Sequence, residues 1–263
     1  MLPLVDIHCH PLPELDDGAS SWDEALAMAR LAVEDGITCI VATAHQLGAY
    51  GHVQGDMIRR QAAQYQQKLD QQGVKLKILP GAEIRIEPEL VPRIERGDLL
   101  SLADRRRHVL LELPHDVYFP IERVLAELKA AGMTCILAHP ERNQAIRSKP
   151  EILAALVRGG CLLQVTGGSL FGAFGRDVQR FTSRLIQQGL VHFVSSDAHG
   201  PRARRPLLAA AFQAVAGLVD EAAAIDLLSR NPACVAEGRD VAPDRPALRR
   251  SSCGGWFFWR KAG

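Results

Sequence analysis

Short, nearly continuous apolar runs alternate with longer amphipathic segments along most of the chain. The short runs predict seven strands, at residues 4–8, 37–44, 74–82, 108–113, 133–139, 161–166 and 191–196. The longer segments predict helices at residues 21–35, 56–72, 121–131, 150–158, 177–188 and 205–218. Apolar strands that alternate with helices are typical of a parallel sheet buried on both faces. The pattern therefore predicts an α/β fold built on one parallel sheet.

Side chains that can bind metal ions stand at or just beyond the ends of nearly all the predicted strands. In chain order they are His8 and His10, His45, Glu83, Glu112, His139, and Asp197 with His199. In an α/β barrel the C-terminal ends of the strands form the active-site face. Histidines scattered over a surface have no reason to follow strand after strand. The sequence therefore predicts a metal centre at this end of the fold.

The spacing and surroundings of these residues suit metal binding. His8 and His10 are two apart, so on an extended segment they share a face, and the same spacing recurs after the seventh predicted strand. Glu83 and Glu112 lie inside apolar runs, where a carboxylate is costly to bury unless a cation lies beside it. Asp17, in an Asp-Asp-Gly turn, is a ninth candidate ligand.

Nine nitrogen and oxygen donors without a thiolate suit manganese, iron or zinc, and they are enough for two or three ions with bridging carboxylates. Clustered divalent ions activate water and hold the oxygens of a phosphoryl group in an in-line displacement. The remaining histidines, His52, His108, His115 and His192, are expected at the surface or at strand edges, with His115 near enough to Glu112 to touch substrate.

Composition places few other constraints on function. The chain has 263 residues, 47% of them apolar and 23% charged, which is ordinary for a globular protein. A formal net charge of +1 gives no bulk attraction to nucleic acid. Without an apolar run of membrane-spanning length or a signal-peptide core before Asp6, we expect a cytoplasmic protein. Six cysteines without a CxxC pair are expected to be reduced.

A cysteine-dependent phosphatase is excluded by the spacing of its C-x5-R loop. The residues six positions after the six cysteines are Leu15, His45, Glu141, Gly167, Asp240 and Trp259, and none is arginine. Three alternatives stay open: a small-molecule phosphatase acting on histidinol phosphate or a nucleotide, an amidohydrolase, and a scaffold without activity. An amidohydrolase usually bridges its metals through a carboxylated lysine, and no lysine stands at a predicted strand end.

The segments DIHCH with DDG, ATAH, GAEI, LLEL, LAHPERN, QVTGGSLFG and SSDAH resemble the PHP (polymerase and histidinol phosphatase) family. More narrowly, they resemble its bacterial branch of capsule-associated, manganese-dependent protein-tyrosine phosphatases. They keep their order from residue 6 to about residue 235, and together they are specific. The resemblance implies a distorted (β/α)7 TIM-like barrel that holds three divalent ions, Mn²⁺ first and Fe or Zn as alternatives.

The resemblance also implies roles for particular residues. One ion would be held by His8, His10, Glu83 and Asp197, a second by Glu83, Glu112 and His139, and a third by Asp17, His45 and His199. Arg142 matches the arginine that contacts phosphate, and a second arginine is expected among Arg202, Arg204 and Arg205, with Arg204 preferred. Many relatives carry proline and histidine beside His45, where this chain has Ala44 and Gln46. The implied substrate is a phosphotyrosyl protein, in particular a membrane-associated tyrosine autokinase that regulates capsular or exopolysaccharide synthesis.

The C-terminal residues differ in composition from the rest. We expect a phosphoesterase domain over residues 1–238 and a poorly ordered tail over 239–263. The tail has six basic and two acidic residues, a net charge of +4, and ends in an aromatic cluster at 256–259. It would fold back on the barrel or, with its aromatic and cationic side chains, contact an anionic membrane surface or a membrane-bound kinase.

Overall fold

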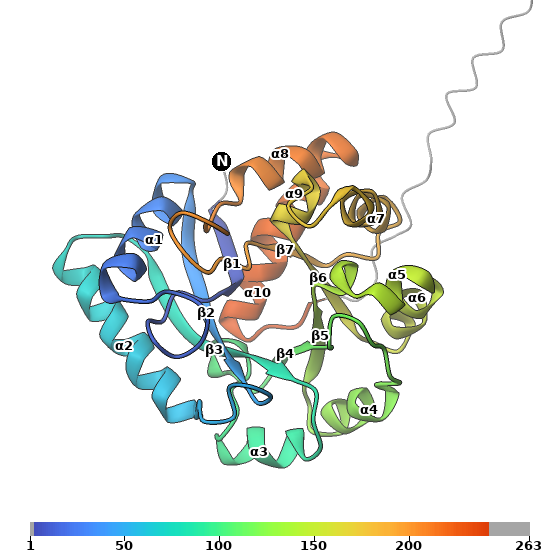
Figure 1. The fold of residues 1–263 in the computed structure, drawn as a ribbon, viewed down its shortest axis with the longest axis horizontal. Helices are drawn as coiled ribbons and strands as arrows, with labels where there is room; N and C mark the ends of the chain where they lie inside the picture. The colour runs from blue at the N-terminus through green and yellow to red at the C-terminus, as the bar shows by residue number, and fades with distance from the viewer. Residues whose placement is uncertain (1–2, 242–263) are drawn as a thin grey trace, which may run out of the picture.

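Seven parallel strands form one sheet whose spatial order follows the sequence, as Figure 1 shows. The computed structural model describes residues 3–241; residues 1–2 and 242–263, and with them nearly all of the predicted tail, lie outside that range. The strands are β1 (Leu4–Cys9), β2 (Ile37–Gln46), β3 (Lys77–Arg85), β4 (His108–Glu112), β5 (Thr134–Ala138), β6 (Leu162–Thr166) and β7 (Phe193–Ser195). All seven predicted strands are confirmed.

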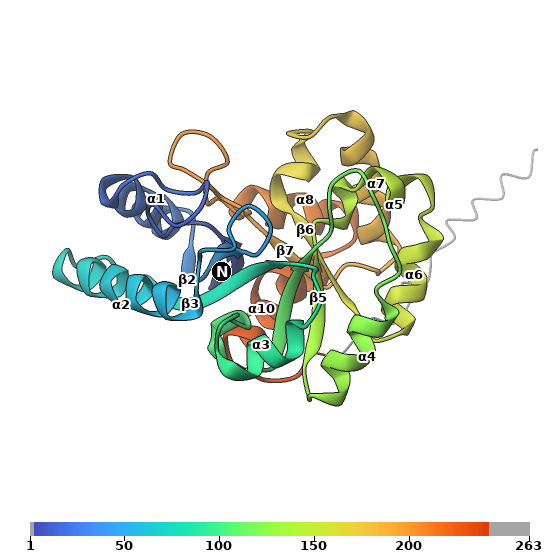
Figure 2. The same cartoon turned by 60° about the horizontal axis from the view of Figure 1, so that its bottom comes forward.

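Helices surround the sheet, most of them on its outer face (Figures 1 and 2). They are α1 (Trp22–Glu34), α2 (Gly55–Gln71), α3 (Leu90–Arg96), α4 (Glu122–Ala130), α5 (Gln144–Ser148), α6 (Glu151–Arg158), α7 (Arg176–Gln187), α8 (Ala209–Leu218), α9 (Glu221–Ile225) and α10 (Asn231–Glu237). Shorter turns are η1 (Leu102–Asp104), η2 (Pro140–Arg142), η3 (Gly167–Phe171) and the π-helical turn η4 (Asp226–Arg230). Within residues 3–241, no helix combines the length and apolar character needed to cross a membrane.

The sheet nearly closes into a barrel, because the end of β1 meets the segment after β7. The backbone N–H of His10 donates to the carbonyl of Ala198 at 2.8 Å, and that of Asp197 donates to the carbonyl of His8 at 2.8 Å. These contacts confirm the predicted distorted (β/α)7 barrel. They also join the two metal-binding pairs that the sequence places at opposite ends of the strand order.

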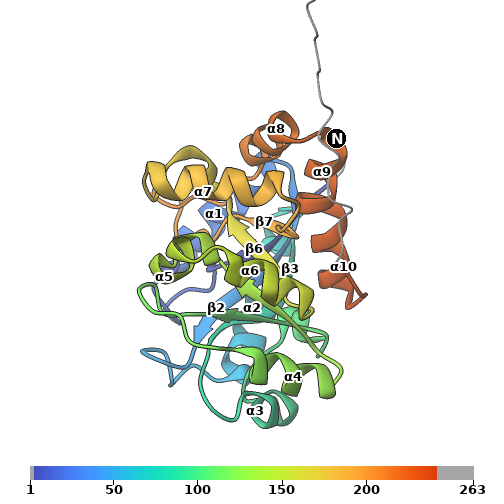
Figure 3. The same cartoon turned by 90° about the vertical axis from the view of Figure 1, so that its right-hand side faces the viewer.

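The interior of the barrel is apolar at one end and polar at the other. Val5, Val41, Leu110, Leu162 and Phe193 are buried together in one cluster inside the ring of strands. Helix α10 joins this cluster; it lies across the centre of the ring in Figure 1 and to one side of the strands in Figure 3. One end of the barrel is therefore capped by α10, and the C-terminal strand ends face the other way.

The predicted metal-binding residues continue the inward-facing positions of this apolar cluster. Alternate residues of a strand share a face, so the face of Val41 continues to His45 and that of Leu110 to Glu112. In the same way the face of Phe193 continues to Asp197 beyond β7. The inward-facing side chains therefore change from apolar to polar along each of these strands toward its C-terminus.

Strand β1 departs from simple alternation through a bulge. Asp6 pairs with Ile40 and Cys9 with Ala42, so three steps along β1 match two steps along β2. An extra residue of this kind reverses the facing of the side chains that follow it. Ile7 packs in the barrel interior, while Cys9 packs in the outer core. Because of the bulge, Ile7 and the two histidines after it, His8 and His10, can all face the barrel interior.

Two predicted boundaries were wrong for local reasons. The third strand was predicted over 74–82 but spans Lys77–Arg85, because Val74 is still bonded to the end of α2, its N–H donating to the carbonyl of Leu69 at 2.9 Å. The last predicted helix begins at Ala209 rather than at 205. Pro206 interrupts the segment, and the carboxylate of Asp35 accepts the N–H of Ala209 at 2.8 Å, where α8 starts.

Candidate metal centre

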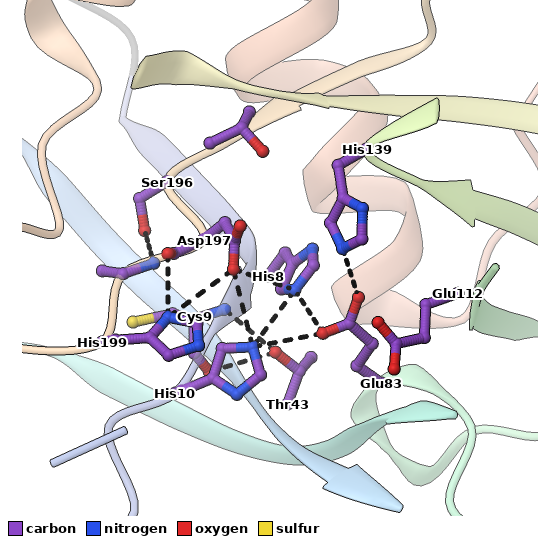
Figure 4. Close-up of polar contacts among 12 residues, drawn as sticks. His8, Cys9, His10, Thr43, Glu83, Glu112, His139, Ser196, Asp197 and His199 are labelled. Carbon is purple, nitrogen blue, oxygen red and sulfur yellow. Dashed lines mark hydrogen bonds and ion pairs between the residues drawn. The ribbon is translucent and has the colours of Figure 1, made fainter. Parts of the chain in front are cut away.

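The nine predicted ligands gather at the C-terminal ends of the strands, and most of them are labelled in Figure 4. Their ligand atoms fall into four groups, within each of which all atoms lie within 4.8 Å of one another. The groups are His10, Asp17, His45 and His199; His8, His10 and Asp197; His8, Glu83 and His139; and His45, Glu83 and Glu112. We call these nine residues the donor cluster.

Glu83 lies at the centre of the donor cluster. Its Oε2 is 3.0 Å from Nε2 of His8 and 3.4 Å from Nε2 of His10, and its Oε1 is 2.7 Å from Nε2 of His139. The two carboxylate oxygens therefore face different histidines, as Figure 4 shows. A carboxylate in this position can bridge two ions.

Asp197 joins the donor cluster to the two predicted arginines. Its Oδ1 is 3.4 Å from Nε2 of His8 and 3.6 Å from Nδ1 of His199. Its Oδ2 receives a hydrogen bond from Arg142 and lies 2.6 Å from Nη2 of Arg204. One edge of this carboxylate thus faces the histidines and the other faces two guanidinium groups.

Among the arginines that follow the SSDAH segment, Arg204 has the ion pair with the site. Arg202 and Arg205 are exposed neighbours of Arg204. His139, Asp197 and Arg204 all have positive φ, of 32°, 52° and 47°. Such backbone conformations cost energy for residues with a side chain and cluster at functional sites. His139 and Asp197 follow directly on β5 and β7, Arg204 lies in the loop after β7, and all three side chains face the centre.

The outer part of the cluster is formed by Asp17, His45 and His199. Oδ1 of Asp17 is 3.5 Å from Nε2 of each histidine, and the Asp17 side chain is 53% exposed. The ring of Tyr50 stacks on that of His45, with centroids 5.2 Å apart. This part of the site is therefore open to solvent, and an aromatic side chain lies at its edge.

Two residues that the sequence analysis did not assign hold the first histidine pair in place. Nδ1 of His8 is 2.8 Å from Oε1 of Gln164, and Nδ1 of His10 is 2.7 Å from Oδ2 of Asp16. Each contact leaves Nε2 facing the cluster. Partners of this kind fix the ring orientation and tautomer of metal-binding histidines. Gln164 lies on β6, the one predicted strand without a candidate ligand, and its polarity inside an apolar run was the available signal.

Close packing against His10 explains why the acidic turn ends in glycine, at Gly18. A Cβ at this position would lie 2.2 Å from the carbonyl oxygen of His10, closer than real contacts allow. The Gly18 N–H donates to Oδ1 of Asp16 at 3.0 Å. The glycine therefore lets the turn pack on His10 and hold Asp16 against the ring.

The electrostatics of the donor cluster suit divalent cations. Burial lowers the pKa of His139 and of His45 to about 4, so both rings are neutral at neutral pH and keep a lone pair. Burial favours protonated Glu83, but the charge of His8 and the hydrogen bonds from His10 and His139 outweigh it and hold the Glu83 pKa well below its usual range. Burial and the charge of Glu83 raise the pKa of Glu112 to about 8. Burial lowers the pKa of His8 and of His10, but the neighbouring carboxylates outweigh it and raise both, that of His10 to about 10. Histidines packed among buried carboxylates form a donor set that divalent ions fit.

The other histidines are placed as follows. His115 lies at the edge of the site, with Nε2 3.4 Å from Nη2 of Arg142. His108 and His192 are buried and stand at the starts of β4 and β7, away from the strand ends that carry the ligands. Their positions at the strand starts fit the expectation of a strand edge, whereas their burial does not fit the expectation of a surface position. Cys9, expected in the core, is fully buried.

Comparisons with known proteins agree with the geometry. A family model described as "Capsular polysaccharide synthesis, CpsB/CapC" matches residues 4–237. Tyrosine-protein phosphatase YwqE of Bacillus subtilis is 40% identical over 203 residues, 76% of this chain and 79% of that protein. Tyrosine-protein phosphatase CpsB of Streptococcus pneumoniae is 25% identical over 234 residues, 87% of this chain and 96% of that protein.

Solved structures resemble the whole barrel. One, described as YwqE from Bacillus subtilis and CpsB from Streptococcus pneumoniae, unique metal-dependent tyrosine phosphatases, has a TM-score of 0.86 and 34% identity. The match covers 94% of this chain and 100% of that chain. A D-hydantoinase has a TM-score of 0.52 and 13% identity, covering 88% of this chain and 70% of that one. At that identity the likeness shows the fold alone.

Proposed function

The chain belongs to the CpsB/CapC family of capsular polysaccharide synthesis, and we propose that it hydrolyses phosphotyrosine in proteins as a metal-dependent phosphatase with its active site at the donor cluster. The observation that carries this proposal is the position of Asp197, between the histidines on one side and Arg142 and Arg204 on the other. A phosphate group placed beside the donor cluster would meet both guanidinium groups.

The donor cluster would hold three divalent ions, with Mn²⁺ as the first candidate and Fe or Zn as alternatives. His8, His10, Glu83 and Asp197 would hold one, Glu83, Glu112 and His139 the second, and Asp17, His45 and His199 the third. The proximity groups support this division, because Glu83 falls in two of them and the outer three residues fall together in another, along with His10. When bound, such ions lower the pKa of water and neutralise charge on phosphate oxygens.

The arginines would bind and orient the phosphate. A planar guanidinium pairs two oxygens at once, so Arg142 and Arg204 can hold the equatorial oxygens of a phosphoryl group as charge develops on them. Asp197 keeps both guanidinium groups in place, and Gln164 and Asp16 keep the rings of His8 and His10 aimed at the centre.

Among residues 3–241, a cysteine nucleophile has no support at the site. Cys9 stands between His8 and His10, but its side chain is fully buried and packs in the outer core. Burial raises the pKa of the Cys9 thiol well above its usual range, whereas a reactive cysteine needs the thiolate. We therefore propose direct hydrolysis by water, without a cysteinyl-phosphate intermediate.

Two alanine variants test the assignment. His139→Ala and Asp197→Ala should abolish turnover of a phosphotyrosyl peptide, because each removes a ligand and Asp197 also orients both arginines. Circular dichroism should report a folded barrel in both. Near wild-type turnover in either folded variant would count against the site.

The alternatives can be separated by substrate. A small-molecule phosphatase would turn over histidinol phosphate or a nucleotide faster than a phosphotyrosyl peptide, and side-by-side kinetics on one preparation decide between them. An amidohydrolase is disfavoured by the site itself, since the bridging position is occupied by Glu83 while Lys77 begins the same strand at its other end. A scaffold without activity would bind no metal and hydrolyse neither substrate.

The cellular setting extends the proposal. A cytoplasmic enzyme acting on a membrane-associated tyrosine kinase of capsule synthesis would fit the family, and the basic, aromatic tail would assist contact with the membrane or the kinase. Removing residues 240–263 should then reduce association with the kinase or with anionic vesicles. Unchanged association of the shortened protein would dismiss this role for the tail.

A further inference from the structure

A hollow of about 400 Å³ lies between α5 and α7. The two helices lie side by side in Figures 1, 2 and 3. Of the residues that the structure describes, three arginines, Arg147, Arg180 and Arg184, line the hollow together with one carboxylate, that of Asp177. We call it the arginine pocket. Its charge is therefore predominantly positive.

The arginine pocket is connected to the proposed active site through the turn that carries Arg142. Nη1 of Arg147 donates to the backbone carbonyl of Arg142 at 2.8 Å and to that of Glu141 at 3.3 Å. The guanidinium of Arg142 lies over the ring of Phe174, 4.6 Å from its centroid, and Phe174 belongs to the loop that leads into α7. The turn that carries Arg142 leads into α5, and the loop that contacts Arg142 leads into α7, so both helices that line the pocket begin beside the proposed phosphate-binding arginine.

Much of the positive charge in the pocket is not balanced by the protein. Arg180 pairs with Asp177 at 2.5 Å, but both side chains are largely exposed, at 72% and 82%, and exposed pairs contribute little. Within residues 3–241, neither Arg147 nor Arg184 has an ion pair with a carboxylate. Arg180 and Arg184 can therefore accept an anionic group from outside without first losing strong internal contacts.

We propose that the arginine pocket binds an anionic group of the substrate protein, a carboxylate or a second phosphate, that lies a few residues from the phosphotyrosine. The inference rests on the proposed function. Guanidinium groups pair two oxygens of a carboxylate or phosphate at once. An extended peptide advances about 3.3 Å per residue, and Arg147 of the pocket contacts the backbone of Arg142, so a segment with its phosphotyrosine at Arg142 can reach the pocket within a few residues. The enzyme therefore prefers acidic phosphotyrosyl segments.

The metal-loaded enzyme and an Arg180→Ala/Arg184→Ala variant provide the test. Arg147 is left in place because it also supports the Arg142 turn. Four substrates are compared: a small aryl phosphate, a phosphotyrosyl peptide with neutral flanks, one with glutamates on either side, and one with a second phosphotyrosine. The variant should raise KM for the two anionic peptides by about tenfold, the effect expected when charge-assisted hydrogen bonds are lost. Their kcat, and both constants for the other substrates, should stay unchanged.

Arg158→Ala provides the matched control, because Arg158 is an exposed arginine at the end of α6 outside the pocket. It should leave all four KM values unchanged, whereas Arg184→Glu should raise KM for the anionic peptides further. Which of the two anionic peptides loses more decides between carboxylate and phosphate. Equal losses on all four substrates, or none, would overturn the proposal.

Direct binding separates this inference from the proposed function. Fluorescence anisotropy with a non-hydrolysable phosphotyrosine analogue in the acidic peptide should show weaker binding to the double variant than to the wild type. Absence of phosphotyrosyl turnover in the wild type would remove the proposed function, whatever the anisotropy result. Loss of binding to phosphatidylserine vesicles in the double variant, with peptide binding unchanged, would assign the pocket to a membrane surface and overturn the peptide proposal.

Discussion

At the scale of single residues, the site depends on side chains that aim the proposed ligands as much as on the ligands. Gln164 and Asp16 each contact the Nδ1 of a histidine and leave Nε2 for a metal ion. The sequence could indicate the nine donors, because each stands at or near a strand end. For these partners its signal was weak: Gln164 is a polar residue in an apolar run, but its contact with His8 joins residues far apart in the chain.

Gln164→Leu should weaken metal binding by about 10- to 100-fold, the usual cost of removing such a partner. The His8 ring would lose the contact that holds it, while the buried volume would hardly change. A metal titration that follows activity should show the loss, and excess metal should largely restore kcat. Gln187→Leu, at the exposed end of α7, is the control and should titrate like the wild type. Equal metal affinities for Gln164→Leu and the wild type would contradict the assigned role.

Glu112 should make the metal-free protein less stable as pH rises. Burial and Glu83 raise its pKa to about 8 in the folded chain from an ordinary value of 4.5. Between these two values the folded state holds a proton that the unfolded state releases, so this group's contribution to stability falls as pH rises. In chelator, Glu112→Gln should therefore gain Tm relative to the wild type from pH 5 to pH 8. A Tm difference that is the same at both pH values would contradict this account.

At the scale of elements, the apolar runs predicted the strands, and the bulge in β1 decides which of its side chains face the barrel interior. The apolar runs located all seven strands, because parallel strands buried on both faces leave a continuous signal. The bulge and the short turns η2 and η3 left no comparable signal, since tertiary contacts fix them. The η2 turn places Arg142 and is held from beneath by Glu141, which is fully buried.

Glu141→Ala should destabilise the barrel and loosen Arg142. The Glu141 carboxylate accepts the N–H of Thr166 at 2.9 Å and the hydroxyl of Ser169 at 2.7 Å, and alanine would leave both donors unpaired. Each buried unpaired group costs about 1–3 kcal/mol. Urea unfolding should show the loss of stability, and KM for a phosphotyrosyl peptide should rise. Glu141→Gln, which keeps an acceptor, should be milder in both; identical behaviour of the two variants would argue against this anchoring.

At the scale of the whole molecule, the apolar packing that stabilises the barrel and the proposed active site lie at opposite ends. Helix α10 and the apolar cluster fill one end, while the donor cluster occupies the other. The sequence predicted the barrel type through its resemblance to the PHP family, and strand ends predicted the active face. The pattern of apolar runs could not predict the contact between β1 and the segment after β7, because this contact joins residues at opposite ends of the chain.

The central claim is that metal ions in the donor cluster are needed to hydrolyse phosphotyrosine. The most direct measurement follows turnover of a phosphotyrosyl peptide together with elemental analysis, before chelation, after chelation and after adding Mn²⁺ back. We predict three divalent ions per chain in the active protein, loss of turnover as they are removed, and recovery as they return. Full turnover by protein that retains no metal would contradict the account.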